Sequence, residues 1–74
     1  MTFFQRIKNL HSETGNSIEV DAGLAGVPEA TFRHLLYAQG HHPSHSTILK
    51  LAKHYNVSTD YLLGVSDTRR RFGE

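Results

Sequence analysis

The chain has no cysteine, no tryptophan and only two prolines among its 74 residues. Without cysteine, a domain of this size has neither disulfide bonds nor thiolate metal ligands, so hydrophobic packing must stabilise it. No apolar run approaches the ~18 residues of a membrane span, and the polar start of the chain lacks a signal-peptide core. We therefore expect a soluble protein of the cytoplasm that has no membrane partner.

A large excess of either charge is also missing, because the formal net charge is +1 with histidine neutral. Residues 1–64 carry five basic and five acidic residues, and the surplus comes from Arg69, Arg70 and Arg71. This balance does not by itself indicate a protein that binds nucleic acid. The three arginines suit an arm that contacts DNA, a solvated linker to a further domain, or a disordered chain end.

The overall composition predicts one small globular domain. Apolar residues make up 38% of the chain and charged residues 20%, which separates it from disordered chains of high net charge. A domain this small has little room for a substrate cavity, and no nucleophile elbow or phosphate loop is present. We therefore expect no enzyme activity, no catalytic residue, no cofactor and no small-molecule substrate.

Apolar residues recur at spacings of three and four, and no stretch alternates with the period of two that marks a strand. The pattern predicts an all-α, compact five-helix bundle, with helices over residues 3–13, between Ser17 and Gly26, from Pro28, up to Asn56, and from Ser58 through Leu63. The predicted N-caps are Thr2, Ser17, Ser58 and either Ser44 or Ser46. The predicted inner faces are formed by Phe3, Ile7, Leu10, Ile18, Ala22, Ala25, Phe32, Leu35, Leu36, Ile48, Leu51, Ala52 and Tyr55.

The stretch AGLAGVPEATFRHLL, residues 22–36, combines a small residue, a glycine four positions later, a valine and a helix that starts with proline. Ala22 leaves room for a close helix crossing, Gly26 permits a positive φ and Val27 fills the gap between the helices. This stretch resembles the helix-turn-helix of the phage lambda repressor and Cro (XRE) family. Ala22, Gly26, Val27, Thr31 and Phe32 stand at the positions of that motif.

A second stretch, ILKLAKHYNVSTDYLLG over residues 48–64, is similar to the fourth and fifth helices of the same family. The matching residues are Leu51, Ala52, Val57, Ser58, Asp60, Tyr61, Leu62 and Leu63. The resemblance covers about residues 3–66. It implies a helix-turn-helix DNA-binding domain over residues 1–66, followed by a basic flexible tail over residues 67–74. It further implies a bacterial or phage transcriptional regulator, a repressor that binds a pseudo-palindromic operator in double-stranded DNA as a homodimer.

Some features depart from the family pattern, among them Ala38, which stands where many members have glycine. Asp21 stands where the family usually has leucine, so we expect the second helix to be rotated or loosened. In the loop after the third helix, His41 and His42 replace the usual lysine and arginine, so we expect weaker phosphate attraction. Together with His45 these histidines also invite a metal-site interpretation. Adjacent histidines usually diverge and no carboxylate is near, so we predict no metal site.

The third helix is predicted to present Ala30, Arg33, His34 and Tyr37 outward, with Glu29 on the flank. In a major groove, arginine can bind guanine O6 and N7, glutamate can accept from cytosine N4, and the alanine methyl can touch a thymine methyl. The alternative is that Glu29 and Arg33, four positions apart, form a surface ion pair worth about 0.3 kcal/mol.

The resemblance assigns phosphate contacts to the start of the second helix and to the loop around residues 40–44. A helix start suits this role because its free N–H groups and dipole attract anions. The predicted DNA-binding residues are Ser17, Ile18, Pro28, Glu29, Ala30, Arg33, His34, Tyr37, His41 and His42. The alternative function is a helix-turn-helix module that binds a protein, as antitoxin-like or anti-repressor partners do, with little DNA affinity. The acidic Asp21 and Glu29 favour that alternative.

Overall fold

The computed structural model describes residues 2–37 and 43–73. Across these two ranges the chain forms five α-helices and no strand. The helices are α1 (Phe3–Thr14), α2 (Ile18–Ala25), α3 (Glu29–Tyr37), α4 (His45–Tyr55) and α5 (Thr59–Leu63). The predicted all-α class is confirmed. None of the helices in the described ranges is long and apolar enough to cross a membrane.

The helix starts follow the predicted capping residues. Thr2 forms a capping box with Gln5 at the start of α1. Ser17, Ser44 and Ser58 each accept a hydrogen bond from the backbone N–H three residues later, at the starts of α2, α4 and α5. Of the two alternatives at α4, Ser44 is therefore the cap. Each such bond satisfies a backbone donor that has no partner inside the helix.

The turns that follow α2 and α4 share one geometry. Gly26 and Asn56 both adopt the left-handed conformation, with φ of 78° and 53°. The next residue then donates its N–H back into the preceding helix: Val27 to the carbonyl of Ala22 and Val57 to that of Ala52, each at 3.0 Å. In both turns the valine is buried, so it joins the hydrophobic core and fixes the direction of the next helix.

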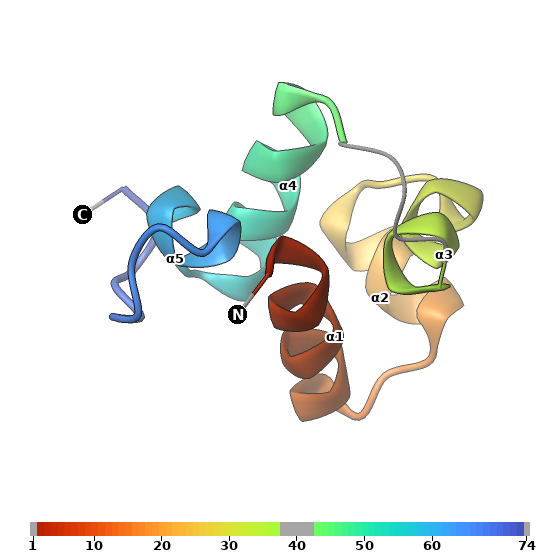
Figure 1. Ribbon diagram of the computed structural model, residues 1–74. Helices are drawn as coiled ribbons and strands as arrows, with labels where there is room; N and C mark the ends of the chain where they lie inside the picture. The colour runs from red at the N-terminus through yellow and green to blue at the C-terminus, as the bar shows by residue number, and fades with distance from the viewer. Residues whose placement is uncertain (1, 38–42, 74) are drawn as a thin grey trace.

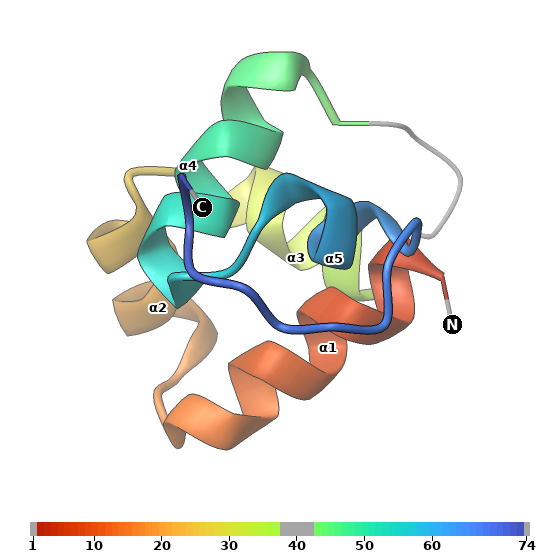
Figure 2. The same cartoon turned by 90° about the vertical axis from the view of Figure 1, so that its left-hand side faces the viewer.

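The core lies where the inner faces of all five helices meet. Every residue predicted to form an inner face is buried or half-buried. The buried apolar cluster consists of Ile7, Leu10, Ala22, Val27, Phe32, Leu35, Leu36, Leu51, Ala52, Val57 and Leu62. Figure 1 shows α2 and α3 at one end of the molecule and α5 with the C-terminal segment at the other, with α1 and α4 between them. The view in Figure 2 agrees, because α5 faces the viewer and α3 lies behind it.

The C-terminal segment, within the predicted tail of residues 67–74, contacts α1 and α5 through its described residues. The guanidinium of Arg69 donates to both carboxylate oxygens of Glu13, at 2.9 and 2.5 Å, and its Nε donates to the hydroxyl of Tyr61 at 2.9 Å. The carbonyl of Arg70 accepts the N–H of Ser58 at 2.7 Å. Sequence patterns miss this segment because its partners lie far away along the chain.

Arg6 of α1 is a buried cation, with 3% of its surface exposed. Its Nη1 donates to the carbonyl oxygens of Tyr61 and Ser66, at 2.7 and 2.5 Å, and its Nη2 donates to Asp67 at 2.7 Å. The guanidinium also lies 4.2 Å from the centre of the Tyr61 ring. These contacts join the end of α5 and the C-terminal segment to α1.

Candidate nucleic-acid interface

The outer face of α3 carries the largest group of predicted site residues. Its inner side chains Phe32, Leu35 and Leu36 are buried, which turns the opposite face to solvent. All of the site residues predicted on and just before α3 are exposed: Pro28, Glu29, Ala30, Arg33, His34 and Tyr37. Tyr37 is 67% exposed although it is aromatic. The helix therefore offers a mixed polar and aromatic surface, nine residues long, at one end of the molecule.

Glu29 and Arg33 form the ion pair that was the alternative to base contacts. Arg33 Nη2 donates to Glu29 Oε2 at 3.3 Å, and about half of each side chain is exposed. Pairs of this type on a helix surface contribute only about 0.3–0.5 kcal/mol, since water screens the charges. The pair therefore holds the guanidinium over α3 loosely enough for it to reach another acceptor.

At the start of α2, backbone N–H groups face solvent, whereas the apolar side chain of Ile18 turns toward the core. Ser17 is exposed, and its hydroxyl oxygen accepts the N–H of Val20 at 3.2 Å. The side chain of Ile18 is half-buried and packs against the core. Of the two predicted residues, Ser17 therefore has an exposed side chain. Ile18 can contact a phosphate only through its backbone N–H.

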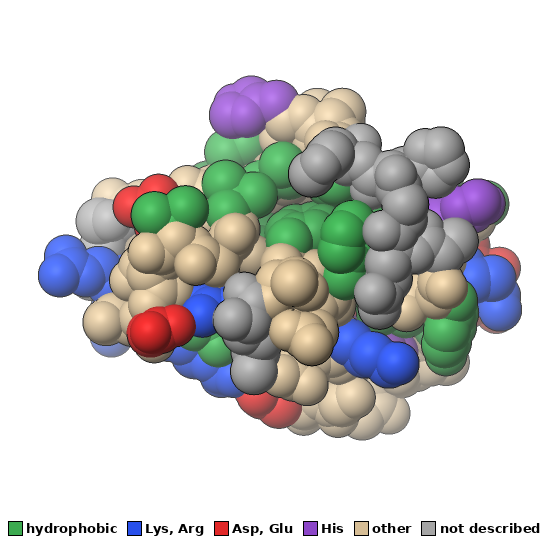
Figure 3. All heavy atoms as spheres, viewed as in Figure 1, with side chains coloured by type: hydrophobic (Ala, Val, Ile, Leu, Met, Phe, Trp, Pro, Cys, Tyr) green, Lys and Arg blue, Asp and Glu red, His purple; other side chains and the backbone are tan. Residues whose placement is uncertain are grey.

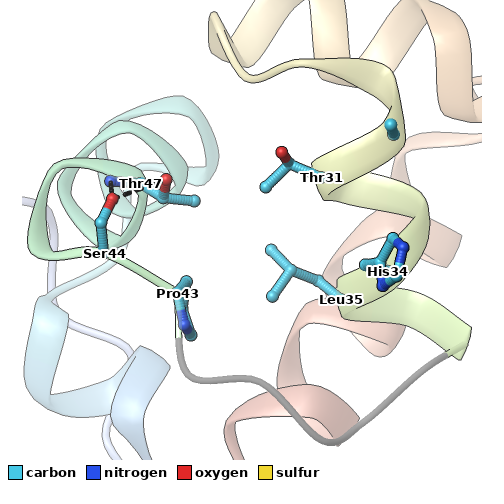
Figure 4. A pocket seen from close by; sticks show the side chains of 7 residues that line it. Thr31, His34, Leu35, Pro43, Ser44 and Thr47 are labelled. Carbon is cyan, nitrogen blue, oxygen red and sulfur yellow. Dashed lines mark hydrogen bonds between the residues drawn. The ribbon is translucent and has the colours of Figure 1, made fainter.

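The predicted residues His41 and His42 lie outside the described residues. Among the described residues, α3 and the start of α4 enclose an open hollow of about 440 Å³. It is lined by Ala30, Thr31, His34, Leu35, Pro43, Ser44 and Thr47. In Figure 4, Thr31 and Leu35 point from α3 across the hollow toward α4, where Ser44 and Thr47 carry hydroxyl groups. The hollow adjoins the outer face of α3 through Ala30, whose short side chain leaves this part of the helix accessible.

Lys8 of α1 lies near the outer face of α3, although no sequence pattern indicates this position. Its Nζ is 5.9 Å from the centre of the Tyr37 ring, at the end of α3. This arrangement adds a cation to the α3 end of the molecule. Lys8 follows the buried Ile7 in α1, but only the crossing of α1 and α3 shows that it reaches Tyr37.

Asp21, at which the second helix was expected to be rotated or loosened, is completely buried, and both of its carboxylate oxygens accept hydrogen bonds. Its Oδ2 accepts from His11 Nδ1 at 2.7 Å and from the Tyr55 hydroxyl at 2.6 Å, and its Oδ1 accepts from His54 Nε2 at 2.5 Å. An ionised carboxylate only accepts, so both ring nitrogens carry a proton. These bonds fasten α2 to α1 and to α4.

The electrostatics of this cluster follow from its donors. Burial alone raises the pKa of Asp21, but the hydrogen bonds from Tyr55, His11 and His54 outweigh burial and hold the pKa below its ordinary value. Burial and the neighbouring carboxylate raise the pKa of Tyr55, so its hydroxyl stays protonated as a donor. Asp21 thus contributes no exposed negative charge beside α3, and it no longer favours a protein partner over DNA.

The remaining charged side chains do not all gather near α3. Figure 3 shows lysine and arginine side chains spread over one face, at both of its ends and along its lower middle part. Arg69 belongs to the end that carries α5, where its hydrogen bond to Glu13 raises the Arg69 pKa and lowers that of Glu13. Within residues 2–37 and 43–73, no group of three or more metal-ligating side chains is placed to hold a metal ion.

Comparisons with family models, with curated proteins and with solved structures gave no match.

Proposed function

We propose that this chain is a helix-turn-helix DNA-binding domain of a transcriptional regulator similar to the phage lambda repressor and Cro family. The observation that carries the proposal is the unit formed by α2, its turn and α3. Gly26 has a φ of 78°, Ala22 is 1% exposed between the helices and Val27 is 5% exposed behind the turn. This packing supports the unit and leaves the outer face of α3 free for a groove.

In the proposed complex, α3 enters the major groove and its first two turns meet the base edges. Glu29, Ala30, Arg33 and His34 supply those turns, and Tyr37 follows at the far end. The start of α2 at Ser17 lies against a phosphate, where its N–H groups and dipole stabilise the negative charge. The protein acts by occupying an operator, and no bond is made or broken.

The charge near α3 is modest in this proposal. Arg33 is paired with Glu29, Lys8 adds a cation beside Tyr37, and the arginines of the C-terminal segment lie at the other end of the molecule. Few phosphates are then neutralised by one protomer, so its non-specific affinity is low. Sequence-specific binding requires a second protomer on a pseudo-palindromic operator.

A duplex-binding titration at several salt concentrations tests the proposal. The logarithm of the association constant should fall linearly with the logarithm of salt, with a slope of about −0.9 for each neutralised phosphate. Lys8→Ala should make the slope shallower by about one phosphate contact. Arg70→Ala is the matched control, because it removes a cation from the end that carries α5, and it should leave the slope unchanged. Absence of binding at low salt overturns the proposal.

A second candidate function is supported by two exposed apolar side chains of α2. Val20 is 50% exposed and Leu24 is 66% exposed, and the two lie four positions apart on one face of the helix. Such a pair suits contact with a partner protein, in line with an interaction module of antitoxin or anti-repressor type. If the chain binds no duplex at low salt, this candidate becomes the better one. Leu24→Ser should then weaken the protein complex and leave the fold intact.

A further inference from the structure

Gly23 lies in the middle of α2 on its exposed side, where the described part of the chain gives no reason for a glycine. Its φ is not in the left-handed range that favours glycine, and a Cβ atom added there would meet no neighbouring heavy atom within 4 Å. Glycine inside a helix is less stable than alanine, because it loses more backbone freedom on folding. The isolated domain therefore loses stability at Gly23 without gaining a turn or a close internal contact.

Two apolar side chains border Gly23 on the same face of α2. Val20 is 50% exposed and Leu24 is 66% exposed. Val20 and Leu24 form one row of residues four positions apart, and Glu19 and Gly23 form the row beside it. Gly23 therefore leaves a notch next to an apolar ridge. Single exposed apolar residues are ordinary, but these two flank a stretch of backbone that is open to close approach.

The charge beside this notch is negative and has no counter-ion. The carboxylate of Glu19 has no hydrogen-bond or ion-pair partner among the residues that the structure describes. By contrast, Arg33 binds the exposed Glu29 at the start of α3. An apolar ridge with an unpaired carboxylate repels DNA phosphates, and α2 of a second copy would bring another carboxylate and no cation. The face instead complements an apolar surface that carries a basic side chain.

We infer that the α2 face formed by Glu19, Val20, Gly23 and Leu24 is the docking site for an amphipathic helix of another protein, with a lysine or arginine beside Glu19. This docking rests on the second candidate function and is independent of DNA binding. A helix fits because its side-chain ridges pack into the grooves of a second helix, and small residues allow the two axes to come closer. The ion pair at the edge fixes the orientation of the partner more than it adds affinity.

A displayed library of helical peptides with one randomised face supplies the probe. The full chain should enrich peptides that carry small or apolar residues along one stripe and a lysine or arginine beside it. Fluorescence anisotropy then measures the affinity of the enriched peptides for variants of the protein. Gly23→Ala should weaken binding by about 5- to 150-fold, because the added methyl group fills the notch. Leu24→Ala should weaken binding by about 10-fold, because it removes apolar contact area.

A charge exchange tests the predicted ion pair. Glu19→Lys should weaken binding by about 2- to 5-fold, and a peptide whose basic residue is changed to glutamate should restore the affinity for this variant. Leu63→Ala is the matched control for Leu24→Ala, since it shortens an exposed leucine of α5 at the other end of the molecule. It should leave peptide binding unchanged.

Urea unfolding separates a role in docking from a defect of the fold. Gly23→Ala should unfold at a higher urea concentration than the unaltered protein, because alanine favours the helix. Weaker peptide binding by a more stable protein then identifies a contact at Gly23.

Equal peptide affinity of Gly23→Ala and the unaltered protein overturns the inference, as does a library that yields no enriched peptide. Self-association that ultracentrifugation shows to be abolished by Gly23→Ala also overturns it, because a second copy then occupies the face. If the enriched peptides depend on Leu24 and not on Gly23, the inference fails and the second candidate function stands. The DNA-binding proposal is decided separately, by the salt titration with duplex DNA.

Discussion

The carboxylate of Asp21 in α2 accepts a hydrogen bond from Nε2 of His54 in α4 at 2.5 Å, although the two residues are 33 positions apart in the chain. Together with the hydrogen bonds from His11 and Tyr55, this contact compensates for the small apolar face of α2. The completely buried positions of α2 are Asp21 and the small Ala22, so apolar packing alone holds this helix poorly. The polar cluster therefore sets the position of α2, and through the turn at Gly26 it sets the position of α3.

Replacement of Asp21 by asparagine should destabilise the fold by about 3 kcal/mol, because it removes a buried charge and turns an amide donor toward three donors. The free energy of unfolding in urea measures this loss. Glu19→Gln is the control, since it neutralises an exposed acid of the same helix and should change stability by less than about 0.5 kcal/mol. Equal stability of the two variants would show that the cluster does not hold α2.

The same cluster predicts a dependence of stability on pH. The pKa of Asp21 is lower in the folded state than in the unfolded chain, where a carboxyl has a pKa of about 3.9. Such a group stabilises the fold above the unfolded value, and its contribution is lost as the pH falls through the lowered folded-state value. We therefore expect the stability difference between the unaltered protein and Asp21→Asn to be full at pH 7 and to shrink below about pH 4.

The free energies of unfolding of the unaltered protein and of Asp21→Asn are measured in urea at a series of pH values and subtracted. The subtraction is needed because the hydrogen bond from Arg69 also lowers the pKa of Glu13. The curve of the unaltered protein alone therefore mixes two carboxyl groups. Both proteins keep Glu13, so its effect cancels in the difference. A difference that stays constant from neutral to strongly acidic pH contradicts the prediction.

Arg6→Lys should destabilise the fold by about 2 kcal/mol even though the charge is kept. The guanidinium reaches the carbonyl oxygens of Tyr61 and Ser66 and the carboxylate of Asp67 at once, and a single ammonium group cannot span these three acceptors. Thermal unfolding followed by circular dichroism measures the loss. Arg70→Lys, at an exposed side chain, is the control, and a loss of similar size there would count against a special role for Arg6.

Arg33→Ala should weaken operator binding by about 1–3 kcal/mol and leave the fold intact. The reason is that its exposed guanidinium has only a weak ion pair in the free protein, so its removal costs little stability. A footprinting titration gives the affinity, and urea unfolding checks the fold. Unchanged affinity removes Arg33 from the interface.

The complex with DNA should contain two protomers related by a two-fold axis. One α3 of nine residues contacts only a few base pairs, so tight binding requires two half-sites whose centres lie about 34 Å apart. Analytical ultracentrifugation of the complex measures its stoichiometry. The result against this prediction is one protomer bound tightly to a single half-site.

Much of the fold could be predicted from the sequence, because its signals are local. Serine caps, left-handed residues at helix ends and apolar spacings act within about four residues, so helix positions and inner faces follow from short stretches. The outward orientation of Arg33 and Tyr37 on α3 follows for the same reason. The candidate site was thus predictable on α3, whereas Lys8 beside Tyr37 was not, since that contact depends on how α1 crosses α3.

The sequence by itself therefore determined the five helices, their ends and the faces that they bury. Only the tertiary structure decided the roles of Asp21, Arg6 and the C-terminal segment. Asp21 resembles a misplaced charge in the sequence because its donors are 10, 33 and 34 positions away. A buried charge is stable only when its partners surround it, and helices that are distant in the chain supply those partners only after they have packed together.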